Sequence, residues 1–279
     1  MILVDAHVHI YDCFDLRIFF NSALANFKSE ASRHGKGDAF NGILLLTEST
    51  TYNWFQYLAG CAMQGKNIQN TQVEPWSLHF TSETCSLWAE SYLGEGLHII
   101  AGRQITTLEH LEVLALLTPK QFADFQPLRQ VIQAVKAAGA VPVVPWGFGK
   151  WTGTRGKILA EKMANSSNCN FFLGDNSGRA SFLPYPALFK MAEKKAIRIL
   201  PGSDPLPFAS ESGRVGRFGF LLDVDMNPDR PAQSIKSILM DSDQAVRPYG
   251  QLETPFCFVR NQLIMQLRKR LRPRRVDKQ

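Results

Sequence analysis

The stretch Val4-Asp5-Ala6-His7-Val8-His9-Ile10 decides the predicted fold and function of this chain. It continues the apolar run Ile2-Leu3, and such an unbroken run is typical of a strand buried on both faces. Because side chains alternate between the two faces of a strand, His7 and His9 are expected to point to the same side. Two neutral imidazoles on one side are a natural start for a divalent metal site. We therefore predict a metal site at the end of the first strand.

The composition is that of a soluble globular protein. The chain has 279 residues, of which 45% are hydrophobic and 20% charged. No apolar stretch approaches the roughly 20 residues of a membrane span, and no signal peptide is visible. The five cysteines are scattered and form no CxxC pair, which argues against a disulfide framework or a cysteine-based zinc site. We expect reduced thiols and a cytoplasmic location.

The net charge of +6 lies in the last twelve residues. The segment from Arg268 to Gln279 holds seven basic residues and one acidic residue, which leaves 24 of each sign in the rest of the chain. The charge therefore does not indicate a nucleic-acid-binding domain. We expect residues 266–279 to form a basic tail that is solvated, and we leave contact with acidic lipid or nucleic acid open.

Apolar runs of strand length alternate with amphipathic helical patterns along the chain. The expected strands are 2–4, 42–46, 97–101, 112–117, 141–145, 170–173, 197–200 and 218–222. The expected helices are 15–34, 122–138, 156–165, 185–195, 232–240 and 256–272. This alternation predicts a single α/β domain over residues 1–265, either a barrel or a doubly wound sheet. The segment 51–93 is less regular and is expected to be an insertion that covers one end.

Polar residues follow six of these strands. In α/β folds the working residues gather at such strand ends, so we expect these clusters to share one site. The clusters are His7 with His9, Thr47-Glu48-Ser49, Gly102-Arg103-Gln104, residues 145–151, residues 174–179, and Pro201-Gly202-Ser203-Asp204.

These clusters resemble the motifs of the PHP family, the polymerase-and-histidinol-phosphatase phosphoesterases. The family's opening HxH is matched by His7 and His9, and its late Gly-Ser-Asp is matched by residues 202–204. Residues 47–49 stand where the family has Thr-Asp-His, and residues 102–105 stand where it has Gly-x-Glu-Ile. The resemblance implies a distorted (β/α)7 barrel that holds two or three metal ions. Amidohydrolase-like barrels share the HxH start and the late aspartate and are a near alternative.

The chain departs from the family pattern at three ligand positions, which hold Ser49, Gln104 and Leu206. Serine and glutamine are poor metal ligands beside carboxylate and imidazole. We therefore expect a reduced site in which His7, His9 and Asp204 hold one Zn, Mn or Fe ion, with a second ion left open. Glu48 or Glu112 is expected to complete or orient this site.

A glycine-rich loop over residues 146–157 carries the candidate anion-binding cations Lys150 and Arg155. Together with Arg179 at another strand end, they are expected to bind an anionic substrate and to stabilise charge in the transition state. Arg103, Arg214 and Arg217 are further candidates.

The predicted function is a metal-dependent hydrolase, a phosphoesterase that acts on an anionic small molecule through a metal-bound hydroxide. The alternative is a catalytically degenerate barrel that binds an anionic or sugar-like ligand without chemistry. A nucleic-acid factor that works through the tail is a third possibility. The sequence does not specify the oligomeric state.

Overall fold

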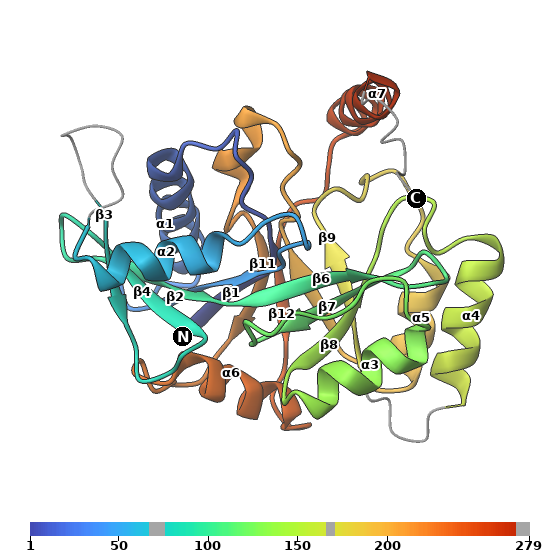
Figure 1. Ribbon diagram of the computed structural model, residues 1–279, viewed down its shortest axis with the longest axis horizontal. Helices are drawn as coiled ribbons and strands as arrows, with labels where there is room; N and C mark the ends of the chain where they lie inside the picture. The colour runs from blue at the N-terminus through green and yellow to red at the C-terminus, as the bar shows by residue number, and fades with distance from the viewer. Residues whose placement is uncertain (67–75, 166–170, 272–279) are drawn as a thin grey trace, which may run out of the picture.

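Twelve strands in the described part of the chain form two sheets, with helices packed on their outer faces (Figure 1). The computed structural model describes residues 1–66, 76–165 and 171–271. The first sheet has the order β12 (Arg247–Gly250), β11 (Phe218–Leu222), β1 (Ile2–Val8), β2 (Asn41–Leu46), β5 (Gly96–Ile100), β4 (Ser86–Ser91) and β3 (Trp76–Phe80). The second has the order β10 (Ile199–Gly202), β9 (Phe172–Asn176), β8 (Val141–Pro145), β7 (Glu112–Leu116) and β6 (Gly102–Thr106).

Strand β1 lies in the middle of the first sheet and is buried along its whole length. It runs parallel to β2 and antiparallel to β11. Leu3 packs into the core under α1, while Ile2 and Val4 pack into a second core on the other face, which explains the unbroken apolar run. The register of β1 against β2 shifts between Asp5 and Val8, so the HxH pair lies where the strand departs from regular pairing.

Backbone hydrogen bonds join the two sheets along two seams. On one side Glu48 N donates to Gly102 O at 3.2 Å and Gln104 N donates to Glu48 O at 2.8 Å. On the other side Asp204 N donates to His7 O at 2.8 Å. A Cβ at Gly202 would lie 2.2 Å from His7 N, so only glycine permits this approach of β10 to β1. The second seam brings the two ends of the predicted site together.

The helices cover the sheets with apolar faces. In α1 (Leu16–Arg33), Asp15 caps the first turn by accepting from Arg17 N at 2.9 Å. The other helices are α2 (Trp54–Met63), α3 (Leu128–Ala137), α4 (Gly153–Ala164), α5 (Ala187–Lys194), the 3-10 helix η1 (Ala209–Arg214), α6 (Pro231–Met240) and α7 (Pro255–Leu271). Helices α3, α4 and α5 share a core with the second sheet through side chains such as Val135, Leu159 and Phe189. Within the described ranges, none of the helices has both the length and the apolar character needed to cross a bilayer.

The predicted single-domain α/β class is confirmed, and several expectations about segments need correction. Residues 102–104, expected as a polar loop, lie in strand β6. The segment 51–93 is more regular than expected, because it forms α2 and the antiparallel hairpin of β3 and β4, which extends the first sheet beyond β5. Residues 266–271 of the predicted tail continue α7, and residues 272–279 lie outside the described part. The strand ladders form two sheets, and the two seams of backbone hydrogen bonds are the links between them.

Candidate metal centre

Three metal-binding side chains converge where β1 and β10 meet. His7 and His9 come from the end of β1, and Asp204 follows β10. The two histidine Nε2 atoms are 3.1 Å apart, and Asp204 Oδ1 lies 3.5 Å from one and 3.6 Å from the other. Tetrahedral ligands about 2.1 Å from one ion would be about 3.4 Å from each other. The spacing therefore fits three ligands of a single divalent ion, and among the described residues these three form the group that could hold a metal ion.

Burial keeps both imidazoles in the neutral form that a metal requires. Loss of solvation lowers the pKa of His7 to about 4 and that of His9 to about 4. At neutral pH both rings therefore present a lone pair rather than a second proton. The Tyr11 ring stacks on His9 with centroids 5.6 Å apart, and burial raises the pKa of its hydroxyl, which stays protonated. Tyr11 therefore covers one face of His9 with an uncharged ring.

Asp204 is held in place by a neighbouring amide. Asn176 Nδ2 donates to Asp204 Oδ2 at 2.8 Å and to Trp146 O at 2.9 Å. This leaves Oδ1 directed at the two histidines. The backbone of Asp204 has a φ of 46°, in the left-handed region that aspartate tolerates better than most residues. Such strain persists where surrounding contacts enforce it, and it is common at functional sites.

Asp5 on β1 holds the loop that carries Asp204 through hydrogen bonds. Its carboxylate is fully buried and accepts from Ser203 N at 2.7 Å and from Gly216 N at 2.9 Å. Ser203 directly precedes Asp204, so Asp5 fixes the loop that carries the third ligand. Burial raises the pKa of Asp5 to about 6, although the hydrogen bonds that it accepts oppose this rise.

Gln104 stands at the edge of the site. Its Oε1 lies 3.3 Å from His7 Nε2, at the position where the resembled family has a glutamate. An amide oxygen is an uncharged hydrogen-bond acceptor, so beside a His7 Nε2 that binds a metal it could serve only as a weak fourth ligand. Gln104 reaches this position because it lies on β6, whose backbone is joined to that of Glu48.

Glu112 and Lys150 form an ion pair beside the histidines. Burial alone would raise the pKa of Glu112, but the charge and hydrogen bond of Lys150, together with the charges of His7 and His9, outweigh this effect, so the pKa falls and the carboxylate is ionised. The charge of Glu112 raises the pKa of both His7 and His9, which places it near them. Among the sequence-predicted residues Glu112, Lys150, Arg155 and Arg179, the first two are those whose charges act on His7 and His9.

Glu48 lies apart from the three ligands. Its Oε1 accepts from the backbone N–H groups of Trp54 and Phe55, so it caps the start of α2. Its Oε2 is 3.5 Å from Arg103 Nη1. The carboxylate is therefore engaged in holding α2 and Arg103, and it does not join the group formed by His7, His9 and Asp204.

The two predicted arginines are engaged elsewhere. Arg179 forms a buried bidentate pair with Asp175 at 2.9 and 2.7 Å, and its guanidinium lies 5.6 Å from the Tyr185 ring. Arg155 Nη2 donates to Gly149 O at 2.8 Å, on an exposed part of the loop. Burial raises the pKa of Asp204, and the charge of Arg214, a further candidate, is one of the smaller effects that oppose this rise. Arg214 is bound to Glu211, Glu253 and Ser177.

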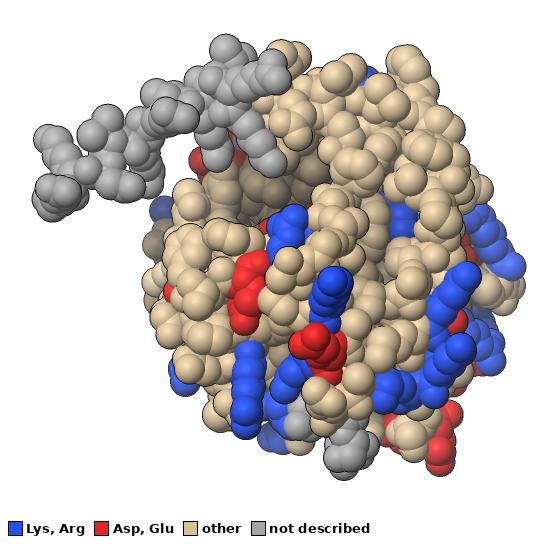
Figure 2. Space-filling model, turned by 90° about the vertical axis from the view of Figure 1, so that its right-hand side faces the viewer, with Lys and Arg blue, Asp and Glu red and all other residues tan. Residues whose placement is uncertain are grey.

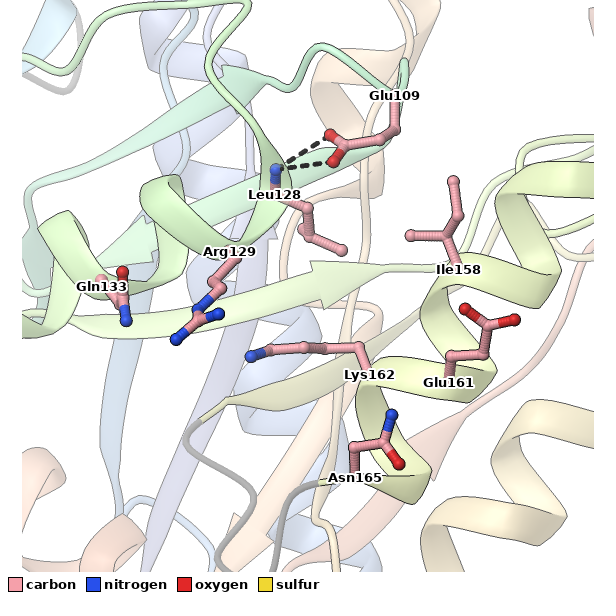
Figure 3. Close-up of a pocket in the computed structure, with 8 residues that line it drawn as sticks. All are labelled: Glu109, Leu128, Arg129, Gln133, Ile158, Glu161, Lys162 and Asn165. Atoms are coloured by element: carbon pink, nitrogen blue, oxygen red, sulfur yellow. Dashed lines mark hydrogen bonds between the residues drawn. The ribbon is translucent and has the colours of Figure 1, made fainter.

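The charged side chains on one outer face form no single-sign patch. Figure 2 shows the side of the molecule that carries α4 and α5, where Lys and Arg side chains are interspersed with Asp and Glu. A groove with a volume of 540 Å³ lies between α3 and α4 on this part of the molecule. In Figure 3 Arg129 and Lys162 extend toward each other across it, and the Glu109 carboxylate accepts from Leu128 N at 2.9 and 3.0 Å. The groove contains none of the three metal-binding side chains.

Comparison with known proteins gives likenesses in fold. No family model matches the chain, and no curated protein matches it. The crystal structure of PsfC from Pseudomonas syringae PB-5123 superposes with a TM-score of 0.51 at 14% identity, over 95% of this chain and 98% of that chain. The crystal structure of endonuclease Q, in complex with a 27-mer duplex substrate with an abasic lesion at the active site, gives a TM-score of 0.50 at 11% identity. That match covers 88% of this chain and 59% of the endonuclease chain. These likenesses show a shared fold.

Proposed function

We propose that this protein is a metal-dependent hydrolase of the PHP type that acts on a phosphate ester or a related anionic small molecule. The observation that carries the proposal is the convergence of His7, His9 and Asp204 within 3.6 Å of one another. Three protein ligands that leave a position open are the pattern of a catalytic rather than a structural site. A divalent ion at such a site supplies Lewis acidity and lowers the pKa of water toward neutrality.

The PHP assignment is supported by the fold. Endonuclease Q, which shares the fold over most of this chain, belongs to the PHP superfamily. The two seams would join β1 and β2 of the first sheet to β6, β7, β8, β9 and β10 of the second as the seven strands of a distorted barrel. The ends of these strands would surround the three ligands. The backbone hydrogen bonds from Asp204 to His7 and from Gln104 to Glu48 support this arrangement.

The remaining residues of the pocket have defined tasks in this proposal. Asn176 orients Asp204 by donating a hydrogen bond to its carboxylate. Asp5 orients it by accepting a hydrogen bond from Ser203 in the same loop. Lys150 is the cation best placed to meet a substrate anion, because its partner Glu112 lies beside the histidines. Glu112 is ionised and can accept a proton from a group that binds near it. Arg155 and Arg179 remain proposals as anion-binding residues, although their donors are engaged.

A second candidate function is a binding protein without chemistry. It is favoured by one observation: the described residues contribute three strong ligands, and Gln104 is the fourth group within reach of His7. Such a site would hold one ion and an anionic or sugar-like ligand but would lack the second metal of a full PHP centre. Both functions include metal binding, but only the hydrolase would turn over an ester substrate.

The experiment measures metal content and turnover together. Protein loaded with Mn²⁺ or Zn²⁺ is assayed with p-nitrophenyl phosphate and with bis(p-nitrophenyl) phosphate. We expect turnover that Asp204→Ala abolishes and that Asp12→Ala, which removes an exposed carboxylate near the site, leaves intact. Bound metal with no turnover of either ester would support the binding protein. Cleavage of duplex DNA but of neither small ester would overturn the proposed substrate class.

We propose a reducing location such as the cytoplasm. The cysteines at positions 13, 61, 85 and 257 are free thiols in the described part of the chain. The predicted absence of a disulfide framework agrees with these four, and Cys169 lies outside the described residues.

A further inference from the structure

Helix α7 carries an apolar stripe on its outer face. Phe256, Val259, Leu263 and Leu267 are between 52% and 76% exposed. Their spacing of three and four residues places them along one side of the helix. The opposite side is buried through Phe258 and Asn261. An amphipathic surface helix normally turns its apolar side inward, so the outward stripe of α7 lacks the usual explanation of core packing.

The inner side of α7 rests on loops that surround the candidate metal centre. The Phe258 ring lies 5.1 Å from that of Phe148, in the loop after β8, and 5.9 Å from that of Phe182, in the loop after β9. Near the other end of the helix, the Arg268 guanidinium lies 4.6 Å from the Phe208 ring, in the loop after β10. In Figure 1 α7 stands apart from the other helices, at the same end of the molecule as these loops. The stripe therefore faces outward from the end where the site is located.

The charge around the stripe has one sign. The sequence of α7 contains no acidic residue, and the exposed Arg260 lies beside the apolar stripe at helical spacing. The segment from Arg268 to Gln279 carries the whole net charge of +6, while the rest of the chain has equal numbers of acidic and basic residues. An apolar stripe beside a polybasic segment combines the two signals that bring a helix to an anionic membrane surface.

We propose that the outer stripe of α7 is a docking surface for an anionic phospholipid bilayer. The stripe would enter the boundary between headgroups and acyl chains, and the positive charge that the sequence carries at this end would attract the surface to acidic headgroups. Aliphatic side chains would gain little from a nucleic acid, which binds through cations and aromatic stacking. A second copy of the chain would bring two polybasic segments of like charge together. The inference does not depend on the proposed hydrolase activity.

The experiment is co-sedimentation of the full-length protein with vesicles. One set contains phosphatidylcholine alone, and the other contains phosphatidylcholine with phosphatidylglycerol. We expect binding to the second set and little to the first. Leu263→Glu with Leu267→Glu should weaken that binding at least about tenfold, because two apolar contacts become anionic. The matched control is Leu93→Glu with Leu108→Glu, two exposed leucines outside α7, which should leave binding unchanged.

Circular dichroism and the thermal midpoint show that both double variants are folded. Absence of binding to the anionic vesicles would overturn the proposal, and so would an equal loss in the control variant. If the α7 variant instead changes the mass of the protein in solution, the stripe is a contact between copies and the proposal is wrong. Retained vesicle binding in the α7 variant would show that charge alone acts and would also contradict it.

Discussion

The metal ligands and the predicted anion-binding cations make an instructive comparison. His7, His9 and Asp204 come from distant parts of the chain and converge with their ligand atoms facing one another. Arg155 and Arg179 lie at equally polar strand ends, yet their donors are taken by Gly149 O and by the Asp175 carboxylate. The first group consists of short side chains, whereas the second consists of long side chains whose donors are paired within the protein.

The difference lies in how many bonds separate each functional atom from the backbone. Placing the backbone of β1 and β10 nearly places the imidazoles and the carboxylate, and Asp5 and Asn176 complete the arrangement. A guanidinium samples many rotamers, and a nearby carboxylate or carbonyl captures it. Position at a strand end therefore predicts function better for histidine and aspartate than for arginine.

The largest expected effect comes from the ligands themselves. His7→Ala with His9→Ala should lower the affinity for Zn²⁺ or Mn²⁺ by more than about 100-fold, since loss of outer-shell partners alone costs 10- to 100-fold. A chromophoric chelator competition measures this affinity. The matched control is His34→Ala with His79→Ala, two exposed histidines outside the site, which should retain wild-type affinity. An equal loss of metal affinity in both double variants would contradict the assignment of His7 and His9 as the ligands.

A large effect on stability is expected from Arg179. Arg179→Met leaves Asp175 buried without its partner, which should lower the free energy of unfolding by about 3 kcal/mol. Asp175→Leu combined with Arg179→Met should recover most of this loss, because a buried ion pair and an apolar pair are often similar in stability. Urea unfolding measures both. If Arg179→Met is as stable as wild type and instead raises KM for the ester, Arg179 binds substrate as the sequence predicted.

A pH-dependent effect is expected from His98, which is buried on β5 with its ring 4.8 Å from that of Trp88. Neither ring nitrogen has a hydrogen-bond partner among the described residues, and burial lowers the pKa of His98 to about 4. The unfolded chain takes up a proton near pH 6.5 and the folded chain does not, so stability should fall as pH drops from 6.5 toward 4.

His98→Leu should remove this contribution, which we expect to be about 2 kcal/mol between pH 7.5 and 5. Urea midpoints at both pH values measure it. His7 and His9 shift in the same direction, so the variant should retain part of the decline. A variant that loses as much stability as wild type on acidification would contradict this assignment.

The smallest expected effects separate Lys150 from Arg155. Arg155 is bound to loop carbonyls on an exposed surface, so Arg155→Ala should change stability by less than about 0.5 kcal/mol and kcat/KM by less than twofold. Lys150→Ala leaves the ionised Glu112 unpaired beside the histidines and should lower kcat/KM about tenfold. Ester turnover with metal-loaded protein measures both. Equal effects of the two variants would remove the distinction between them.

The α/β class and the convergence of the HxH pair with Asp204 could be expected from the sequence. The alternation of strands with helices, and the apolar run of a buried strand, are local residue patterns. The chain shows such an apolar run directly before His7. The hairpin of β3 and β4 was missed because its strands are short and alternate imperfectly, and its pairing with β5 depends on tertiary contacts. Strand β6 was missed because Gly102 and Arg103 are typical of a loop.

The outer layer of the site was less predictable. Glu48 lies two residues beyond the end of β2, as the polar pattern indicated, yet its carboxylate caps α2, a helix that the sequence did not predict. Asn176 belongs to the polar cluster of residues 174–179, and only its bond to Asp204 reveals its role. Its position at the end of a buried strand was the available signal. Side-chain direction depends on which element lies nearest, and that information is tertiary.

The measurement that tests the central claim most directly is anomalous diffraction from crystals soaked in Mn²⁺ or Zn²⁺. The account predicts one peak about 2.0 to 2.2 Å from His7 Nε2, His9 Nε2 and an Asp204 oxygen, with Glu48 still on α2. A peak that lies elsewhere, or no peak at this position in protein that binds the metal in solution, would contradict it.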